Sequence, residues 1–175
     1  MSAEPAAVRP LTVADLPAYK ALRDEMLFAH PEAFTSDAAT EARKEPAEYL
    51  QRLGVGRREG GHFTLGAWRG SKLMGAIGCE REASVKVSHI GHVIGMMVRP
   101  EARGQGIGRA LLEATIAGAR RAGLETLTLT VTAGNANAVA LYESSGFVLW
   151  GTLARALQIG ARYHDKLHMA LELRR

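Results

Sequence analysis

The stretch 96-MMVRPEARGQGIGRALL-112 decides how the rest of the chain is interpreted. It reads as the end of an apolar strand, then a basic and glycine-rich turn, then the first turns of a helix. The N–H groups at a helix start have no intrahelical partner and lie at the positive end of the helix dipole, so they bind anions. Between Arg103 and Arg109, alternating glycines let the backbone approach a ligand closely. The stretch therefore predicts a binding site for a diphosphate.

The composition favours one domain. A chain of 175 residues that is 47% hydrophobic can bury one sizeable core, and we expect a single domain over residues 1–175 with a core at about 7–173. No apolar run is long enough to span a membrane, and the opening MSAEPAAVRP lacks the features of a signal peptide. The one cysteine, Cys79, lies in an apolar run and is expected to be a core residue in a reducing compartment. These features predict a cytoplasmic protein with no membrane partner.

The charge pattern argues against nucleic acid as a partner. The net charge is +4, but the 22 basic residues are scattered along the chain, and aromatic residues make up only 6%. Base stacking therefore has little support. A mildly basic surface better suits a small polyanion.

Hydrophobic periodicity and turn residues predict the order of the elements. Before the glycine loop we expect a strand, two helices and three antiparallel strands, at 8–11, 13–30, 36–53, 62–69, 72–82 and 89–98. After it we expect a helix to about 123, a strand at 124–131, a short helix at 135–145, and strands at 147–156 and 163–173. Because a helix separates the strands 89–98 and 124–131, these two must run parallel. The predicted fold is α/β, with a mixed, mostly antiparallel central sheet of about seven strands, about four flanking helices and a splayed parallel pair. Gly91 and Gly95, inside one strand, indicate a bulge or a close approach of a ligand.

Two blocks of this sequence resemble the GCN5-related N-acetyltransferase (GNAT) superfamily. The first matches its acyl-CoA signature of Arg or Gln, two residues, Gly, one residue, then Gly or Ala, here Arg103, Gly106 and Gly108. The second matches its N..A..LY...GF pattern, here Asn135, Ala138, Leu141, Tyr142, Gly146 and Phe147. The resemblance implies the fold of that family over the whole chain, acetyl-CoA as co-substrate and no metal.

The resemblance also implies roles for single residues. The main chain of one strand end would bind the pantetheine arm, at Met96, Met97 and Val98. The loop would hold the pyrophosphate through Arg103, Gly104, Gln105, Gly106, Ile107, Gly108 and Arg109. Asn135 would bind the pantetheine or its thioester end, and Tyr142 would protonate the leaving thiolate. A phenol with an ordinary pKa of about 10 carries a proton at neutral pH, which suits that role. The alternative for Tyr142 is a helix residue packed on the sheet. A backbone N–H near Met97 or Val98 is the natural oxyanion donor.

The base is where the chain departs from the family. Many members carry a glutamate twelve positions before the tyrosine, and that position here is Thr130, which cannot take a proton at neutral pH. Others carry a glutamate at the position that is His92 here, and an imidazole is a competent base. His92 as base competes with a hydrogen-bonded strand histidine and with a substrate-positioning role. Glu80 and Glu82 could bind an acceptor ammonium, relay its proton or form a solvated strand face, and water alone could suffice as the base.

The acceptor pocket of this fold would lie between the first two helices and the last hairpin. Candidate residues there, each competing with an ordinary surface role, are Glu25, His30, Glu32, Phe34, Arg155, Tyr163, His164 and Asp165. The ending GTLARALQIGARYHDKLHMALEL loosely resembles the last hairpin of small-molecule N-acetyltransferases, including the phosphinothricin and amino-acid branch. In that branch the aspartate supports the hairpin, so we assign Asp165 no catalytic role.

These patterns predict an enzyme that transfers acetyl from acetyl-CoA to a primary amine, more often a small molecule than a protein. Transfer would be direct within a ternary complex, since no cysteine or serine nucleophile motif is present. The alternatives are a protein N-terminal or lysine acetyltransferase and a non-catalytic acyl-CoA-binding regulatory domain. Members of the family often pair through their late strands, so the resemblance allows a homodimer, but no residue pattern in the sequence supports one.

Overall fold

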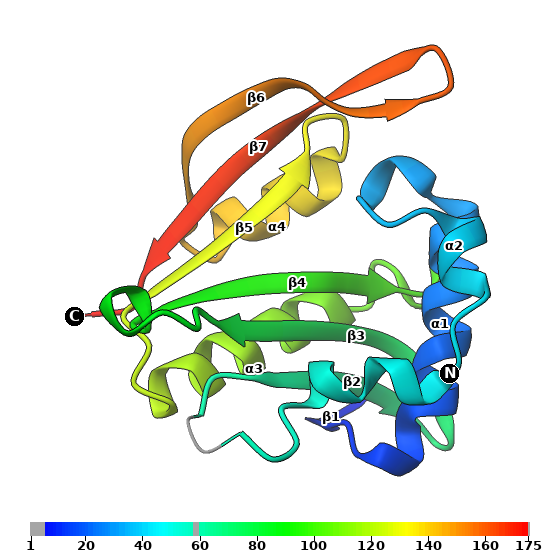
Figure 1. Ribbon diagram of the computed structural model, residues 1–175, viewed down its shortest axis with the longest axis horizontal. Coiled ribbons are helices and arrows are strands. Elements are labelled where there is room, and N and C mark those ends of the chain that lie inside the picture. The colour runs from blue at the N-terminus through cyan, green and yellow to red at the C-terminus, as the bar shows by residue number, and fades with distance from the viewer. Residues whose placement is uncertain (1–5, 58–59, 175) are drawn as a thin grey trace.

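The computed structural model describes residues 6–57 and 60–174. Residues 1–5 and 175 of the predicted domain, and 58–59 within its core, lie outside these ranges. Its centre is a seven-stranded sheet in the order β1-β2-β3-β4-β5-β7-β6 (Figure 1). The strands are β1 (Ala7–Pro10), β2 (Phe63–Arg69), β3 (Lys72–Arg81), β4 (Ile90–Val98), β5 (Thr126–Thr132), β6 (Val148–Ile159) and β7 (Arg162–Glu172).

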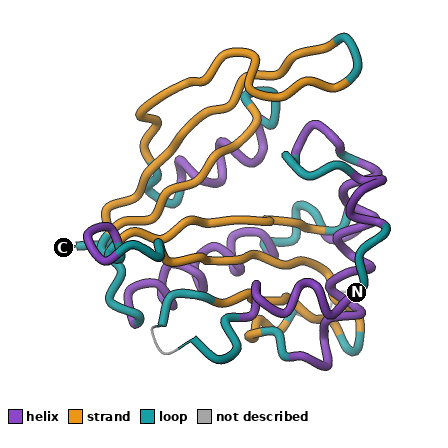
Figure 2. The backbone as a smooth tube through the Cα atoms, viewed as in Figure 1, coloured by secondary structure: helices purple, strands orange, loops and turns teal. Residues whose placement is uncertain are grey.

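Helices cover both faces of the sheet (Figure 2). The α-helices are α1 (Leu16–Ala29), α2 (Ala38–Ala42), α3 (Ile107–Arg121) and α4 (Ala136–Ser144). Five 3₁₀ segments connect them and the strands, η1 (Val13–Asp15), η2 (Pro31–Ala33), η3 (Pro46–Leu53), η4 (Val85–Val87) and η5 (Pro100–Ala102). The mixed α/β architecture predicted from the sequence, with its parallel pair, is confirmed.

Two apolar clusters hold these layers together, because alternate strand residues face opposite sides of the sheet. Under α3, Leu111, Leu112 and Ile116 pack with Ile77 and Leu127. On the opposite face α1 and η3 pack against other strand residues, in a cluster of Leu16, Tyr19, Leu22, Met26, Tyr49, Leu53, Leu73 and Met97. Cys79 is fully buried in the first cluster, and burial raises the pKa of its thiol to about 12, so its predicted core role is confirmed.

The parallel pair β4 and β5 separates soon after it forms. Their register covers only Ile90 with Thr126, Gly91 with Leu127, and His92 with Thr128. Beyond His92 the two strands diverge, as Figure 1 shows. The later part of β4 therefore presents backbone groups on this side that pair with no neighbouring strand.

The predicted irregularity in β4 is confirmed as a bulge at Gly95. Opposite β3 the register moves from Ala76–Met97 to Gly78–Ile94, so that β4 carries one extra residue there. Gly95 has φ +58, a backbone conformation that favours glycine. Gly91 instead pairs regularly with Arg81, and a Cβ there would lie 2.7 Å from Leu124 Cδ1. Tight side-chain packing explains that second glycine.

The single second helix predicted at 36–53 is wrong. The segment forms two pieces, α2 and η3, with an extended residue between them. Glu45 has φ −80 and ψ 152, the conformation that a following proline imposes, and Pro46 begins η3. The predicted helix at 13–30 is correct except that its first turn is the 3₁₀ segment η1, where the Asp15 carboxylate accepts a hydrogen bond from the Thr12 N–H at 2.8 Å.

Candidate active site

The glycine loop places the start of α3 at the surface. Gly106 caps the helix with φ +79, and Gly104 has φ +73. A Cβ at either glycine would meet no atom within 4 Å, so the loop leaves open space above the backbone. The first bond into the helix runs from the Ala110 N–H to the Gly106 carbonyl at 2.9 Å, which leaves the N–H groups before it free of helical partners. The loop is an open cradle of N–H donors.

Polar contacts fix the side chains around this cradle. Gln105 accepts a hydrogen bond from Arg69 and donates one to the Glu101 carbonyl, both at 2.7 Å. Arg103 Nη2 lies 2.8 Å from His30 Nε2. Arg109 Nη2 reaches Ser144 Oγ on α4 at 3.3 Å. The two exposed arginines of the loop therefore lie at its two ends, as a site for an anion requires.

A cavity of about 340 Å³ lies where β4 and β5 separate. Its walls include residues 93–96 of β4, residues 130–132 of β5, residues 33–36 at and after the end of η2, and residues 135, 138 and 142 at the N-cap and within α4. The cavity adjoins the loop, because the Cβ position of Gly108 lies 3.4 Å from Met96 Cε, and Met96 lines the cavity. A ligand bound at the loop can thus extend past Met96 into the cavity.

Tyr142 lies in the cavity wall on α4 and is only 6% exposed. Its ring meets Phe147 edge to face with centroids 5.8 Å apart. Burial raises the pKa of the Tyr142 phenol to about 12, because the charged phenolate is disfavoured away from water. Within the described part of the chain its hydroxyl has no hydrogen-bond partner, which leaves the proton available to a ligand.

Asn135 lies beside it at the N-cap of α4. Its Oδ1 accepts a hydrogen bond from the Ala138 N–H at 3.2 Å, which orients the side chain. Asn135 also lines the cavity, so its amide nitrogen is the group that remains for a ligand. Met97, in contrast, has its side chain buried in the core at 1% exposure, and only its main chain could contact a ligand.

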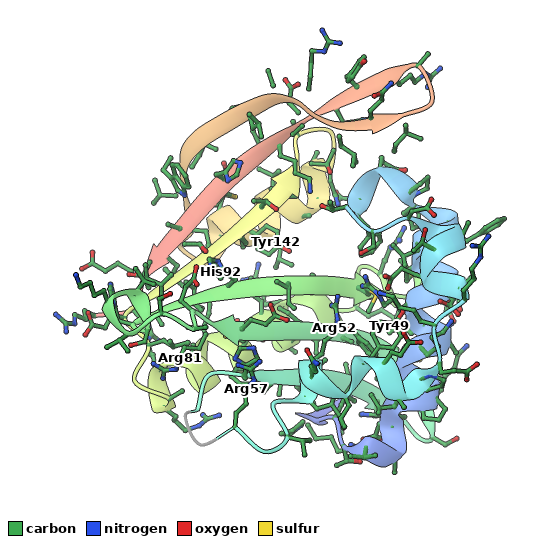
Figure 3. The ribbon with its side chains drawn as sticks, viewed as in Figure 1. Tyr49, Arg52, Arg57, Arg81, His92 and Tyr142 are labelled. Carbon is green, nitrogen blue, oxygen red and sulfur yellow. The ribbon has the colours of Figure 1, made fainter. Side chains whose placement is uncertain are left out.

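His92 lies near the point where β4 and β5 separate (Figure 3). Its Nε2 is 2.7 Å from Glu82 Oε1, and its Nδ1 is 2.5 Å from Thr128 Oγ1. Glu80 is its direct neighbour across the sheet and lines the cavity, whereas His92 and Glu82 do not. Thr130 lines the cavity wall on β5. The imidazole of His92 therefore contacts the carboxylate of Glu82. His92 lies one residue before Val93, which lines the cavity.

Most of the predicted acceptor residues lie elsewhere, and of that set only Phe34 lines the cavity. Glu25 pairs with Arg99. Arg155 stacks over Tyr163, with its guanidinium carbon 3.9 Å from the ring centroid. The Asp165 carboxylate accepts a hydrogen bond from the Arg155 N–H at 2.8 Å, which confirms that it supports the hairpin.

Sequence reasoning missed three basic residues of the cavity wall, Arg23, Arg52 and Lys166. Arg23 could have been identified from the sequence, because it follows Leu22 on the apolar side of a predicted helix. Arg52 and Lys166 could not, because their positions depend on how η3 and β7 pack.

Two further observations bear on the kind of site. Across residues 6–57 and 60–174, no group of three or more histidine, cysteine, aspartate or glutamate side chains could hold a metal ion. No helix in those ranges is long and apolar enough to cross a membrane.

The sequence is similar to known proteins over most of its length. The model of the acetyltransferase (GNAT) family matches residues 19–147, well over half of the chain. A mycothiol acetyltransferase from Thermobispora bispora is 49% identical over 61 residues, which are 35% of this chain and 21% of that protein. The chain thus matches about a fifth of the length of that relative.

Solved structures share the whole fold. A ribosomal-protein-alanine N-acetyltransferase from Brucella melitensis superposes with a TM-score of 0.81 at 30% identity, covering 95% of this chain and 99% of that one. The protein yncA from Salmonella typhimurium, solved with its cofactor acetyl-CoA, has a TM-score of 0.82 at 22% identity, covering 98% and 96%.

Proposed function

The chain belongs to the acetyltransferase (GNAT) family, and from that premise we propose that it is an N-acetyltransferase that moves acetyl from acetyl-CoA to a primary amine. One observation carries the proposal. An open cradle of N–H donors adjoins a cavity whose wall holds the unpartnered hydroxyl of Tyr142. The first feature suits the diphosphate of CoA, and the second suits protonation of its thiolate.

The donor site fits acetyl-CoA residue by residue. The cradle from Arg103 to Arg109 would hold the pyrophosphate, and the space above Gly104 and Gly106 leaves room for it. The main chain of Met96, Met97 and Val98 would bind the pantetheine along the edge that β5 leaves free. The Asn135 amide would bind near the thioester.

When bound, acetyl-CoA supplies an activated acetyl group as a thioester. The acceptor nitrogen forms the new C–N bond to the carbonyl carbon, and the C–S bond breaks. Tyr142 donates its proton to the departing sulfur and recovers one from solvent, while the amine loses its proton to a base. A backbone N–H at the bulge, near Met97 or Val98, would stabilise the oxyanion.

We assign the base to His92, acting through water. If Nε2 donates to Glu82, then Nδ1 accepts from the Thr128 hydroxyl. The Thr128 hydroxyl would pass its proton to Nδ1 and take one from the water that deprotonates the amine, and the Glu82 carboxylate would stabilise the imidazolium. Glu80 is the second candidate, because it lines the cavity directly.

We place the acceptor among small amines. Relatives include a mycothiol acetyltransferase and a ribosomal-protein-alanine N-acetyltransferase, so the family covers both small and protein acceptors. The size of the cavity, about 340 Å³, lies within the range of small-molecule sites.

The experiment that tests the proposal measures thiol release from acetyl-CoA with a library of small amines and peptides. Acceptor-dependent release together with a mass increase of the acceptor is the expected result. Tight CoA binding with no acceptor-dependent release would instead indicate a non-catalytic acyl-CoA-binding domain.

Gly106→Ala is expected to raise the KM for acetyl-CoA about tenfold with little change in kcat. An added Cβ enters the space of the diphosphate, and the positive φ of Gly106 resists a side chain. Gly123→Ala is the matched control at the other end of α3, since it has φ +74 and equally open surroundings. Steady-state kinetics of both variants measure the KM for acetyl-CoA and kcat. An equal effect at the two positions would mean that strain, and not the diphosphate, is responsible.

His92→Gln is expected to lower kcat/KM about 100-fold and to remove an acidic limb of the pH profile. An imidazole acts as a base only when neutral, whereas the amide of glutamine cannot serve as a base. His89→Gln, at an exposed position just before β4, is the control. An unchanged pH profile with a near-normal rate in His92→Gln would mean that Glu80 or water, and not His92, is the base.

A further inference from the structure

The charges in the cavity wall do not balance. Three basic side chains line it, from Arg23, Arg52 and Lys166, against one carboxylate, from Glu80. Arg23 already has a carboxylate partner within the protein, because its Nε lies 2.8 Å from Glu41 Oε2. Two cations and one carboxylate therefore face the cavity without a charged partner among the described residues.

Arg52 reaches the cavity from the last turn of η3, as Figure 3 shows at the α1 end of β4. Among the described residues its guanidinium makes only weak contacts. Nη1 lies 3.4 Å from the Tyr19 hydroxyl, and the group sits 5.9 Å from the Tyr49 ring centroid. The same Nη1 lies 3.5 Å from the Cβ position of Gly95, at the bulge of β4. Its planar set of N–H donors is thus held at the cavity wall with most of its hydrogen-bonding capacity unused.

Lys166 reaches the cavity from β7, on the other side of the gap between the strands. It lies opposite Thr132 of β5 in the sheet, and its Nζ donates to the Thr35 hydroxyl. Burial lowers the pKa of Lys166. A partly buried ammonium whose partner is a neutral hydroxyl is stabilised by an anion, and none is supplied by the described chain.

Glu80 occupies a different part of the wall. It lies on β3 directly opposite His92. The paired residues Gly78 and Ile94 are two residues further along the same two strands. Arg52, in contrast, adjoins the bulge at Gly95. The cavity therefore offers a carboxylate near the proposed base and cations at other parts of its wall.

We propose that the acceptor is a small primary amine that also carries a carboxylate, with its amine on the Glu80 and Tyr142 side and its carboxylate bound by Arg52 and Lys166. This inference rests on the proposed acetyl transfer. The guanidinium of Arg52 can bind a carboxylate through two parallel hydrogen bonds, and Lys166 adds a third donor. The carboxylate supplies the charge that the two cations lack.

The test compares acceptors in matched sets with wild-type protein. Each of the common L-amino acids is assayed beside its carboxamide and the amine that lacks the carboxylate, by thiol release from acetyl-CoA. The best amino acids should show kcat/KM values at least tenfold higher than their carboxamides, because the amide cannot replace two charge-assisted hydrogen bonds.

Variants of Arg52 and Lys166 test whether these two cations cause the preference for amino acids over carboxamides. Arg52→Met and Lys166→Met should each lower kcat/KM for the amino acid about 10- to 100-fold, mainly through KM, and leave the carboxamide and the KM for acetyl-CoA unchanged. Arg52→Lys should recover part of the loss. Lys86→Met removes an exposed cation on η4 and is the matched control. Circular dichroism checks that each variant folds.

The outcomes separate the inference from the proposed function. Equal rates for amino acids and carboxamides, or transfer to peptides alone, would overturn the carboxylate assignment and leave acetyl transfer standing. A preference for amino acids that survives both methionine variants would overturn the roles of Arg52 and Lys166. No thiol release with any amine would overturn the proposed function and this inference with it.

Discussion

Tyr142→Phe is expected to lower kcat about 10²- to 10⁴-fold, the range that a general acid contributes. The substitution removes one hydroxyl that has no partner among the described residues, and it keeps the ring contact with Phe147. Binding of acetyl-CoA should therefore change little, so that kcat and kcat/KM fall together. Steady-state kinetics and a binding isotherm for CoA measure the two effects.

The pH dependence of the wild-type enzyme provides a second check on Tyr142. Because burial raises the pKa of this phenol to about 12, the group stays almost fully protonated up to about pH 10. We therefore expect no loss of rate from Tyr142 between pH 7 and pH 10. Tyr163→Phe, at an exposed tyrosine of β7, is the control and should keep full activity. Full activity of Tyr142→Phe would end its assignment as proton donor.

Glu41→Gln is expected to lower the free energy of unfolding by about 3–5 kcal/mol, the cost of leaving a buried charge unpaired. Glu41 is 5% exposed and joins α2 to α1 and η3. It lies 2.8 Å from Arg23 of α1, 2.6 Å from Lys44, and 2.8 Å from the Tyr49 hydroxyl of η3. Arg23, at 2% exposure, would lose its carboxylate partner. Urea denaturation followed by circular dichroism gives the value.

The same carboxylate makes stability depend on pH. Burial opposes ionisation of Glu41, but hydrogen bonds from Lys44, Arg23 and Tyr49 outweigh it and lower its pKa from 4.5 to about 2. A depressed folded-state pKa stabilises the protein above the unfolded value, and this contribution is lost as pH falls from about 4.5 toward 2. The wild-type protein should lose stability across that window more steeply than Glu41→Gln.

An exposed ion pair is the control for this prediction. Glu101 pairs with Lys72 at 2.8 Å, but both side chains are about half exposed, so Glu101→Gln should cost less than about 1 kcal/mol. Replacing Arg23 and Glu41 together by apolar residues should cost less than Glu41→Gln alone, because no unpaired buried charge remains and the side chain of Lys44, 38% exposed, is hydrated. A loss below 1 kcal/mol in Glu41→Gln would show that water reaches Arg23.

Local patterns predicted the donor half of the molecule well. The loop and α3 carry their signal within one stretch, because glycines at positive φ and a helical period act over a few residues. The bulge at Gly95 was visible for the same reason. The prediction of a single helix at 36–53 was wrong because it rested on apolar spacing alone. It did not take into account that Pro46 holds the residue before it in an extended conformation.

The acceptor half depends on packing between distant segments, and the sequence indicates it poorly. Lys166 lines the cavity because β7 pairs with β5, more than thirty positions away in the chain. Arg52 does so because η3 packs beside α1. His92 was identified by its position, but its contacts with Glu82 and Thr128 depend on two neighbouring strands. Such pairings have no local signature.

The early separation of β4 and β5 has a consequence for engineering. Among the described residues, the strand register between the two halves of the sheet covers Ile90, Gly91 and His92, and the His89 carbonyl accepts two more bonds from the N–H groups of residues 125 and 126. An apolar layer lies beneath them. The loop that we propose to bind the diphosphate belongs to one half together with α3, whereas the β6–β7 hairpin and Lys166 belong to the other. A designer could therefore graft a different hairpin to obtain a new acceptor range and keep the donor module unchanged.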